Sequence, residues 1–395
     1  MKILRDGTIT SPKGFLAGAA AAEIKYQGRL DLGILFSEKP CTVAGRFTRN
    51  KIKAAPVQWC QEIVKSGKAQ AVIVNSGCAN ACTGTQGMKD AKAMAQAAAM
   101  KLDISDESVL VASTGVIGVK LPVDKIEAGT MMMELSPRGG HDLARAIMTT
   151  DTHPKEIAVA VAEYGFTIAG IAKGAGMIHP DMATMLSFLT TDAKIDARLL
   201  DRFLGEAVDA SLNMITVDGD TSTNDTVLIL ANSAGGAVKA GTKAAEAFAQ
   251  ALSQVCTYLA RSIAADGEGA TRLIEVTVEG AKTLADARMA ARTIVGSPLV
   301  KSAVHGCDPN WGRIIAALGR SGADFNPKKV DLYLAGMQLM SAGEPVSFDK
   351  KKAGAAMGKD EVKVRVALNG GKHQATAWGC DLTAEYVVIN SDYTT

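Results

Sequence analysis

Residues 173–186 read Lys-Gly-Ala-Gly-Met-Ile-His-Pro-Asp-Met-Ala-Thr-Met-Leu, so a glycine-rich stretch leads to a small residue and a threonine at the start of an apolar run. The hydroxyl of Thr184 can attack the carbonyl of Ala183, and hydrolysis of the resulting ester would split the chain. An N-terminal amine has an ordinary pKa of about 7.7 to 8, so part of it is unprotonated at neutral pH and can act as a base. The junction therefore predicts a self-cleaving nucleophile at Thr184, although an internal threonine is more often an ordinary strand residue.

The apolar pattern on both sides of this junction predicts alternating strands and helices. Runs rich in β-branched and other apolar residues predict strands at 71–74, 109–111, 157–161, 167–172, 185–189, 227–230 and 273–278. Apolar residues recur at spacings of three or four at Phe248, Leu252, Val255, Leu259 and Ile263. That spacing predicts a helix over 243–265, and a stretch rich in Ala and Met predicts another over about 88–102.

Near the C-terminus, residues 362–366, 373–378 and 386–389 alternate or run apolar, and Asn-Gly-Gly at 369–371 separates the first two runs. Such a turn between two runs predicts a β-hairpin. Helices mixed with antiparallel strands favour an α+β fold. The chain has no linker or repeat, so the best candidate boundary is the cleavage point, with 1–183 and 184–395 folding into one core.

The composition favours a globular protein that binds small molecules. Of 395 residues 47% are hydrophobic, and 43 Lys and Arg oppose 41 Asp and Glu, which gives a net charge of +2. This balance provides no strong field for nucleic acid or an anionic membrane. No segment resembles a signal peptide or membrane span, so we expect a cytoplasmic protein.

The seven cysteines are scattered and odd in number, as is typical of free thiols in a reducing compartment. Cys78 and Cys82 are the closest pair, but no second pair or paired histidine lies near them in sequence. We therefore expect no metal site.

Blocks of small and polar residues recur along nearly the whole chain. They are Asn-Ser-Gly at 75–77, Ala-Asn-Ala-Cys-Thr-Gly at 79–84, Ser-Thr-Gly-Val-Ile-Gly at 113–118, Asp-Gly-Asp-Thr-Ser-Thr-Asn-Asp at 218–225, Asp-Gly-Glu-Gly-Ala-Thr at 266–271, Asp-Pro-Asn-Trp-Gly-Arg at 308–313 and Asn-Ser-Asp-Tyr-Thr-Thr at 390–395. Together with Met-Ala-Thr-Met-Leu at 182–186, this ordered set resembles the ornithine acetyltransferases, also called glutamate N-acetyltransferases. Cys78 departs from the pattern, since an asparagine is common there.

The resemblance implies an α+β sandwich of β-sheets flanked by helices, similar to the self-processing aminopeptidases. It also implies an α chain (1–183) and a β chain (184–395), with two copies of each associating. The implied reaction belongs to arginine biosynthesis: Thr184 takes acetyl from N2-acetylornithine and passes it to glutamate, with no cofactor. Acetyl-CoA is a second donor in some members, and the sequence leaves its use here open.

The same resemblance assigns the site residues. Thr114 and Gly115 form the oxyanion hole, although Ser-Thr-Gly after a strand is also an ordinary turn. The implied substrate contacts are Thr150, Lys173, Thr184, Glu268, Asn390 and Thr395. A buried ammonium at Lys173 is costly unless it meets an anion, whereas a lysine reaching out from a strand end is equally compatible with the local sequence.

Two other functions remain open from the residues alone. An N-terminal-nucleophile amidase or aminopeptidase would share the self-cleavage and let water resolve the acyl-enzyme. An unprocessed amino-acid-binding protein would use Thr184 only as the first residue of a strand.

Overall fold

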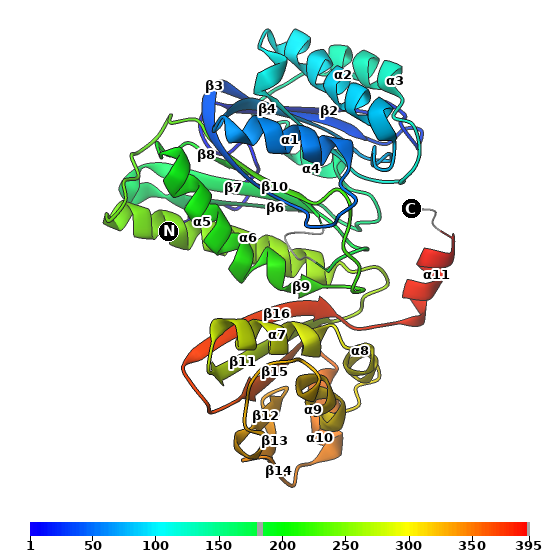
Figure 1. The fold of residues 1–395 in the computed structure, drawn as a ribbon, viewed down its shortest axis with the longest axis vertical. Helices are drawn as coiled ribbons and strands as arrows, with labels where there is room; N and C mark the ends of the chain where they lie inside the picture. The colour runs from blue at the N-terminus through cyan, green and yellow to red at the C-terminus, as the bar shows by residue number, and fades with distance from the viewer. Residues whose placement is uncertain (180–184, 393–395) are drawn as a thin grey trace. The chain divides into compact units, whose positions relative to one another are not determined.

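The computed structural model describes residues 1–179 and 185–392, and these divide into two compact units. Of these residues, the first unit comprises those within Met1–Asn213 and Asp220–Leu259, and the second comprises Met214–Gly219 and residues 260–392. The boundary is therefore crossed more than once by the chain. Figure 1 labels the elements of both units.

The first unit is built on a nine-stranded sheet in the order β1-β6-β7-β8-β10-β3-β4-β5, with β2 paired to β3. Its strands are β1 (Lys2–Ile3), β2 (Phe15–Ala20), β3 (Leu32–Phe47), β4 (Lys68–Asn75), β5 (Val109–Ser113), β6 (Lys155–Val161), β7 (Phe166–Lys173), β8 (Leu186–Thr191) and β10 (Thr226–Ala231). The β8–β10 and β4–β5 pairs are parallel, and the other pairs are antiparallel. The sheet is therefore mixed.

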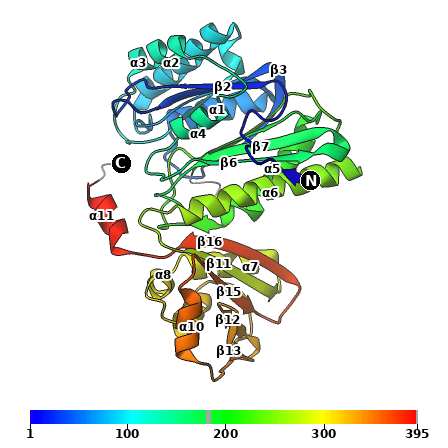
Figure 2. The ribbon, with the colours of Figure 1, turned by 180° about the vertical axis from the view of Figure 1, so that it is seen from behind.

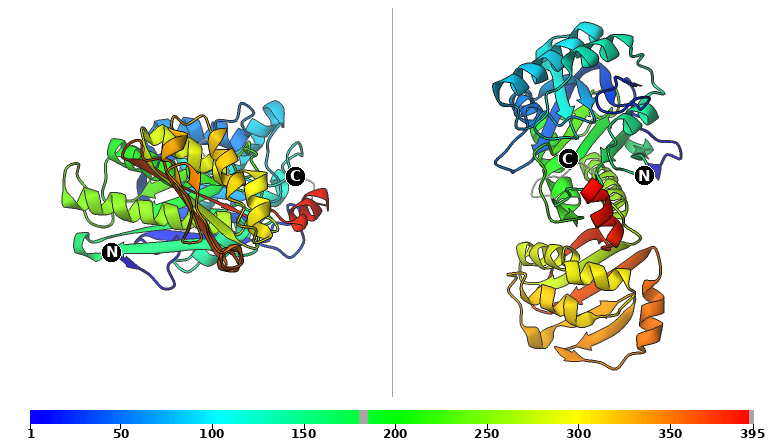
Figure 3. Two further views of the ribbon diagram at one scale, coloured as in Figure 1. Left: turned by 90° about the horizontal axis from the view of Figure 1, so that it is seen from below. Right: turned by 90° about the vertical axis from the view of Figure 1, so that its right-hand side faces the viewer.

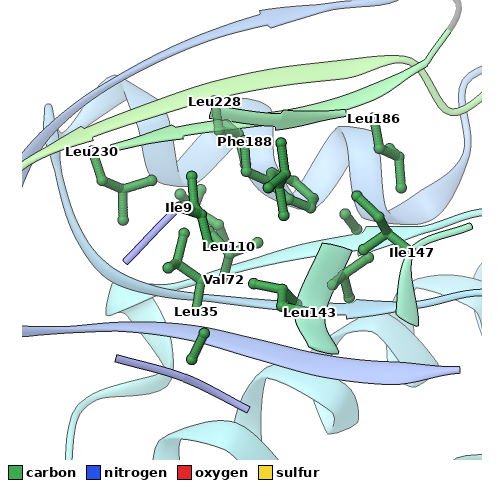
Figure 4. Close-up of a cluster of buried hydrophobic side chains, with 14 of the residues drawn as sticks. Ile9, Leu35, Val72, Leu110, Leu143, Ile147, Leu186, Phe188, Leu228 and Leu230 are labelled. Carbon is green, nitrogen blue, oxygen red and sulfur yellow. The ribbon is translucent and has the colours of Figure 1, made fainter. Parts of the chain in front are cut away.

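The long strand β3 joins two halves of this sheet. Its first part pairs with β2 and β4, its last part pairs with β10, and an irregularity separates Phe36 from Cys41. Side chains of both halves meet in one buried cluster, in which Val72 and Leu110 lie across from Phe188 and Leu228 (Figure 4). The sheet thus folds over itself into a sandwich around its own core, because strands buried on both faces must find apolar partners.

Helices flank the sandwich. They are α1 (Ala55–Lys65), α2 (Gly84–Leu102), α3 (Val123–Met132), α4 (Gly140–Ala146), α5 (Ala197–Ala210) and α6 (Lys243–Ala265), and short 3-10 turns lie at η1 (Asp106–Ser108), η2 (Ala162–Tyr164) and η3 (Leu212–Met214). Met94 and the alanines of α2 form a second cluster with β4 and β5. On the other half, α6 runs alongside β6 and β7 (Figure 2), and Phe248 of α6 packs against Phe166 and Phe203.

The second unit has a seven-stranded sheet in the order β14-β13-β12-β15-β11-β16-β9. Its strands are β9 (Ile215–Thr216), β11 (Leu273–Ala281), β12 (Asp331–Leu334), β13 (Met337–Ser341), β14 (Glu344–Pro345), β15 (Glu361–Ala367) and β16 (His373–Cys380). Its helices are α7 (Leu284–Val295), α8 (Pro298–His305), α9 (Trp311–Gly319), α10 (Lys350–Met357) and α11 (Ala384–Asp392), with a 3-10 turn at η4 (Pro327–Lys329). Helix α7 covers β11 and β16, and α9 packs beside α7 (Figure 3).

The predicted α+β class and most predicted elements are confirmed. Each apolar run before the C-terminal region forms a strand, and the helix predicted over 243–265 has those bounds as α6. The Ala-rich helix ends at residue 102 as predicted but begins at Gly84, because Gly84, Thr85 and Gln86 extend it without apolar spacing.

The C-terminal hairpin prediction is wrong. The strands β15 and β16 are not neighbours, because β11 lies between them and pairs with both. The turn meant to join a hairpin instead spans the end of β11, where the Leu368 amide donates to Glu279 and the Gly370 and Gly371 amides donate to Gly280. A strand from far back in the sequence thus replaces the local partner.

The apolar run at 386–389 also differs from the strand-like pattern, since it lies in helix α11. The hydroxyl of Thr383 accepts from the Tyr386 amide at 3.4 Å, which is the arrangement of a helix cap. A local cap thus overrides the β-branched composition of the run.

The seven cysteines are all free thiols. Within residues 1–179 and 185–392, no helix combines the length and apolar character needed to cross a bilayer. The same described residues contain no group of three His, Cys, Asp or Glu side chains arranged to hold a metal ion.

Candidate active site

The turn after β5 carries the two residues predicted to form an oxyanion hole. The Thr114 amide donates to Asn75 O at 3.0 Å, and the Val116 amide donates to Gly77 O at 3.3 Å. Between them, the Gly115 amide donates to no acceptor in the described part of the chain. An amide left over between two bonded neighbours is a donor that a ligand can use.

Only glycine fits at the centre of this turn. Gly115 has φ of +125°, which side-chain-bearing residues rarely adopt. A Cβ there would lie 2.4 Å from the Gly77 carbonyl carbon and 2.7 Å from the Cys78 nitrogen. Two backbones therefore touch at this point, and their contact fixes the direction of the Gly115 amide.

A buried asparagine ties the turn to a distant segment. The Asn224 side-chain amide donates to Ala79 O at 2.6 Å and to Ser113 O at 2.8 Å. Its side chain is buried, so both bonds are shielded from water. The sequence interpretation did not single out Asn224, although the polar block at 218–225 that contains it was a signal.

The structure brings Lys173 to Thr114. Lys173 is the last residue of β7 and is only 7% exposed, and its Nζ donates to Thr114 Oγ1 at 3.3 Å. Because an ammonium can only donate, the Thr114 hydroxyl keeps its own proton for a second bond. The positive charge also polarises that hydroxyl toward donation, as an oxyanion site requires.

A fully buried ion pair lies beside Thr150 and Lys173. Asp151 Oδ1 is 2.7 Å from Lys155 Nζ, neither side chain is exposed, and the same oxygen accepts from the Gly174 amide at 2.7 Å. The hydrogen bond joins the turn that carries Thr150 to the residue after Lys173. Sequence patterns did not identify either member of the pair, because nothing local distinguishes them from surface charges.

The pKa of Asp151 reports on the charges around it. Burial alone would raise this pKa, but the charges of Lys173 and Lys155, together with hydrogen bonds from Gly174 and Lys155, outweigh burial and lower the pKa to about 2. Asp151 is therefore an anion at neutral pH and a permanent counter-charge for Lys173. The predicted contact of Lys173 with a substrate carboxylate stays a prediction.

A second buried carboxyl group, Asp225, lies beside the residue that follows Thr184. Burial raises the pKa of Asp225 well above its ordinary value, although hydrogen bonding with Ser222, the charge of Lys173 and the Met185 amide all act to lower it. Its Oδ2 atom has no hydrogen-bond partner among the residues described. A protonated Asp225 can therefore donate as well as accept.

The residues Ala183, Thr184 and Thr395 lie outside the described residues, but both flanks of the junction are placed. On one side, Thr221 Oγ1 donates to His179 O at 2.8 Å. On the other, the Thr226 amide donates to Met185 O at 2.9 Å. One segment, 221–226, therefore holds the chain before and after residues 180–184.

In the second unit, the structure brings together Glu268 and Asn390. Asn390 Nδ2 donates to Glu268 Oε2 at 2.8 Å and to Tyr386 O at 3.0 Å. Nearby, Thr383 Oγ1 donates to Gly269 O at 2.8 Å, which ties the Gly-Glu-Gly loop to the start of α11. Two of the predicted substrate contacts are therefore direct neighbours, and their contact with substrate stays a prediction.

Comparisons with known proteins point in one direction. A sequence profile of the ArgJ family matches residues 16–395. The arginine biosynthesis bifunctional protein ArgJ of Dehalococcoides mccartyi is 56% identical and covers 100% of this chain and 98% of its own, and that of Symbiobacterium thermophilum is 54% identical with 98% and 99% covered. The crystal structure of the Bacillus halodurans protein of that name covers 53% of this chain and all of its own, with 45% identity and a TM-score of 0.52.

Proposed function

The chain belongs to the ArgJ family, and we propose from this premise that it moves an acetyl group from N2-acetylornithine to glutamate. The resemblance predicted from the motif blocks is thereby confirmed, and the protein is an enzyme of arginine biosynthesis. Its relatives are named as bifunctional proteins of arginine biosynthesis, which supports a second activity, and we propose that this activity is acetylation of glutamate by acetyl-CoA.

We propose that the chain first cuts itself between Ala183 and Thr184. The Thr184 hydroxyl attacks the Ala183 carbonyl, an ester replaces the peptide bond, and water then releases the carboxylate of Ala183. The product carries a free amine on Thr184 next to its hydroxyl. Hydrogen bonds from the 221–226 segment to His179 and to Met185 support this step, because one segment holds the chain on each side of the proposed cut.

Transfer follows in two half-reactions. The Thr184 oxygen bonds to the acetyl carbon of N2-acetylornithine, the carbon–nitrogen bond breaks, and the proton of the hydroxyl passes through the Thr184 amine to the departing ornithine amine. The glutamate amine then takes the acetyl group from the threonine ester, and Thr184 recovers its proton. Each half-reaction passes through a tetrahedral oxyanion.

The observation that carries this proposal is the turn at Thr114 and Gly115. Its unused Gly115 amide and its Lys173-bonded Thr114 hydroxyl supply two donors in a fixed arrangement. One such pair can serve both half-reactions, because the oxyanion forms at the same carbon position each time. A single donor of this kind contributes about 2.7–4 kcal/mol in other acyl-transfer sites.

We further propose that the enzyme needs no bound cofactor, works in the cytoplasm and assembles from two copies each of the 1–183 and 184–395 chains. The near balance of 43 basic and 41 acidic residues supports small-molecule substrates over nucleic acid or membrane.

The decisive experiment combines intact-mass spectrometry with substitution of the nucleophile. Wild-type protein is expected to appear as two fragments. After incubation with acetylornithine, the 184–395 fragment should gain one acetyl group on Thr184. Thr184→Ala is expected to stay full length and unacetylated, whereas Thr184→Ser keeps a hydroxyl and cleaves more slowly. An Ala variant that still cleaves or still takes up acetyl contradicts the proposal.

The oxyanion role has a separate test. Thr114→Ala is expected to lower kcat by about 10²–10³-fold with a small change in KM. Thr114→Ser, which keeps the hydroxyl, is the matched control and should retain most activity. Release of free acetate in place of acetylglutamate would instead favour an amidase, in which water resolves the acyl-enzyme.

A further inference from the structure

A second site in the first unit lies at an open cavity of about 1010 Å³. The cavity lies between the chain that leads from β3 into α1 and the start of α2. The residues that the argument uses are Arg49, Lys51, Lys53, Ile52, Thr83 and Met88. None of these residues has a part in the acetyl transfer proposed above.

The lining has a charge imbalance that the whole chain lacks. Arg49, Lys51 and Lys53 contribute three positive charges, and no Asp or Glu is among the residues that line the cavity. In the complete sequence, by contrast, 43 basic residues meet 41 acidic ones. Three cations around a concave surface produce a local positive potential that attracts anions of several charges.

The N-terminus of α2 adds to this potential. Thr83 precedes the helix but does not cap it, because its hydroxyl donates to Asn80 Oδ1 at 2.7 Å. No acidic residue lies in the first turn, and the amides of Gly84, Thr85 and Gln86 have no acceptor among residues the structure describes. In a helix of 19 residues these amides form the positive end of the dipole, which is a site suited to phosphate.

Hydrogen bonds connect the cavity walls to the candidate active site. On the α2 side, the Gly118 amide, just after the oxyanion turn, donates to Ala81 O at 3.0 Å. On the other side, Asn50 Nδ2 donates to Thr221 O at 2.9 Å, and Thr221 in turn donates to His179 O. The α2 wall is therefore continuous with the turn at Thr114 and Gly115, and the other wall with the segment that precedes residues 180–184.

We propose that this cavity binds the phosphates of coenzyme A when acetyl-CoA is the acetyl donor. The inference rests on the proposed function, since it concerns that same acetyl transfer. Acetylornithine carries one carboxylate and one ammonium, and glutamate carries two carboxylates and one ammonium, so neither needs a cluster of three cations. Coenzyme A, by contrast, carries a 3′-phosphate and a diphosphate. Ile52 and Met88 offer apolar surface for the adenine.

The long pantetheine arm of this donor allows its phosphates to lie away from the reacting carbon. At the nucleophile, the Thr184 oxygen bonds to the acetyl carbon as the carbon–sulfur bond breaks. The hydroxyl proton passes to the sulfur, and coenzyme A leaves as a thiol. The later transfer to glutamate is the same as with acetylornithine.

The test measures coenzyme A binding and acetylornithine–glutamate exchange on the processed wild-type enzyme and on the double variant Lys51→Gln/Lys53→Gln. Calorimetry with coenzyme A, dephospho-coenzyme A and pantetheine gives the phosphate contribution directly. We expect coenzyme A to bind wild type at least about 10-fold more tightly than pantetheine, with dephospho-coenzyme A between them. Adenosine 3′,5′-bisphosphate should compete with coenzyme A for binding. The contribution of the phosphates to coenzyme A affinity should weaken with added salt.

The double variant should lose about 10-fold or more of its coenzyme A affinity while acetylornithine–glutamate exchange stays as in wild type. The double variant Lys65→Gln/Lys68→Gln, at exposed lysines outside the cavity lining, is the matched control and should bind coenzyme A normally. Equal affinity for coenzyme A and pantetheine, or unchanged binding in the cavity variant, would overturn the proposal. Failure of exchange in wild type would instead count against the proposed function, because calorimetry does not depend on turnover.

Discussion

The turn at Thr114 and Gly115 in the first unit, which we propose forms the oxyanion hole, and the Glu268–Asn390 pair of the second unit are held in very different ways. At the turn, Gly115 packs against the backbone of Gly77 and Cys78, and the buried Asn224 side chain donates hydrogen bonds to the carbonyls of Ala79 and Ser113. Glu268, by contrast, meets Asn390 through one side-chain bond, and α11, which carries Asn390, has no buried residue along Ala384–Asp392.

This difference separates two physical tasks. Stabilising a developing oxyanion requires donors that do not move, because any reorganisation adds to the barrier. Contacts to the rest of a substrate can be ordered on binding, at some cost in affinity. We therefore expect damage to the turn to appear in stability and kcat, and damage to the Glu268–Asn390 pair to appear mainly in KM.

The strongest test of this contrast is Gly115→Ala. Positive φ costs about 1–3 kcal/mol and overpacking about 1–3 kcal/mol more, and we expect the upper end because the clashing neighbour is backbone. Gly118→Ala is the matched control, since φ is +82° there but no atom lies within 4 Å of the added Cβ. Urea unfolding measures the free energy of unfolding of both variants. Equal losses in the two variants would mean that the backbone contact at Gly115 does not affect stability.

Next comes Asp151→Asn, which leaves Lys155 buried without its counter-charge. We expect a loss of about 3–5 kcal/mol at pH 7. The pKa of Asp151 is lowered to about 2, so the stabilisation is present above the unfolded pKa of about 3.9 and is lost as pH falls toward about 2.

The difference between wild type and Asp151→Asn should therefore shrink between about pH 4 and pH 2. Asp142→Asn, which removes an exposed partner of Arg145 at 3.6 Å, should cost less than about 1 kcal/mol and serves as control. An equally small loss of unfolding free energy for Asp151→Asn would mean that the Asp151–Lys155 pair does not stabilise the region around Thr114 and Lys173.

Asp225→Asn is expected to act through pH. The folded pKa of Asp225 is raised, so its contribution to stability is full below the unfolded pKa and is lost as pH rises through the folded pKa. Relative to the Asn variant, wild type should lose up to about 1.4 kcal/mol per pH unit in that window. Denaturant titrations from pH 4 upward measure this slope, and parallel curves for the two proteins would contradict it.

The smallest effect on stability is expected for Glu268→Gln, at less than about 1.5 kcal/mol, because it changes one hydrogen bond. Loss of a charged contact of about 1.5–3 kcal/mol should nevertheless raise KM for acetylornithine by roughly 10–100-fold. Glu385→Gln, on the exposed first turn of α11, is the control. A large loss of unfolding free energy in Glu268→Gln would show that the Glu268–Asn390 pair is needed for stability, contrary to the contrast drawn above.

The local pattern of apolar residues was enough to predict most strands and the long helix α6. An element that buries one or both faces has apolar residues at a regular spacing, and this spacing can be read from the sequence. The local pattern failed for the supposed hairpin of β15 and β16, because β11 takes the central place from far back in the chain. Strand order depends on such distant competition, which no window of ten residues contains.

The same limit applies to the candidate site. The motif blocks predict Thr114 and Lys173 as site residues, and the structure adds the hydrogen bond between them. Asn224 and Asp151 were missed, because their roles come from partners such as Ser113, 111 residues from Asn224, and Gly174, 23 residues from Asp151. Asparagine and aspartate in polar loops look the same whether they are solvated or buried.

The antiparallel ladder between β7 and β8, from Ile168 opposite Thr191 to Lys173 opposite Leu186, spans the proposed cut. A nick at Thr184 breaks one loop, whereas every rung of this ladder remains. If the two pieces were translated from separate messages, each would instead present a bare strand edge in the middle of a sheet, ready to pair with the wrong neighbour. We therefore expect the proposed cleavage at Thr184 to follow folding, because the β7–β8 ladder then forms within one chain before the loop is cut.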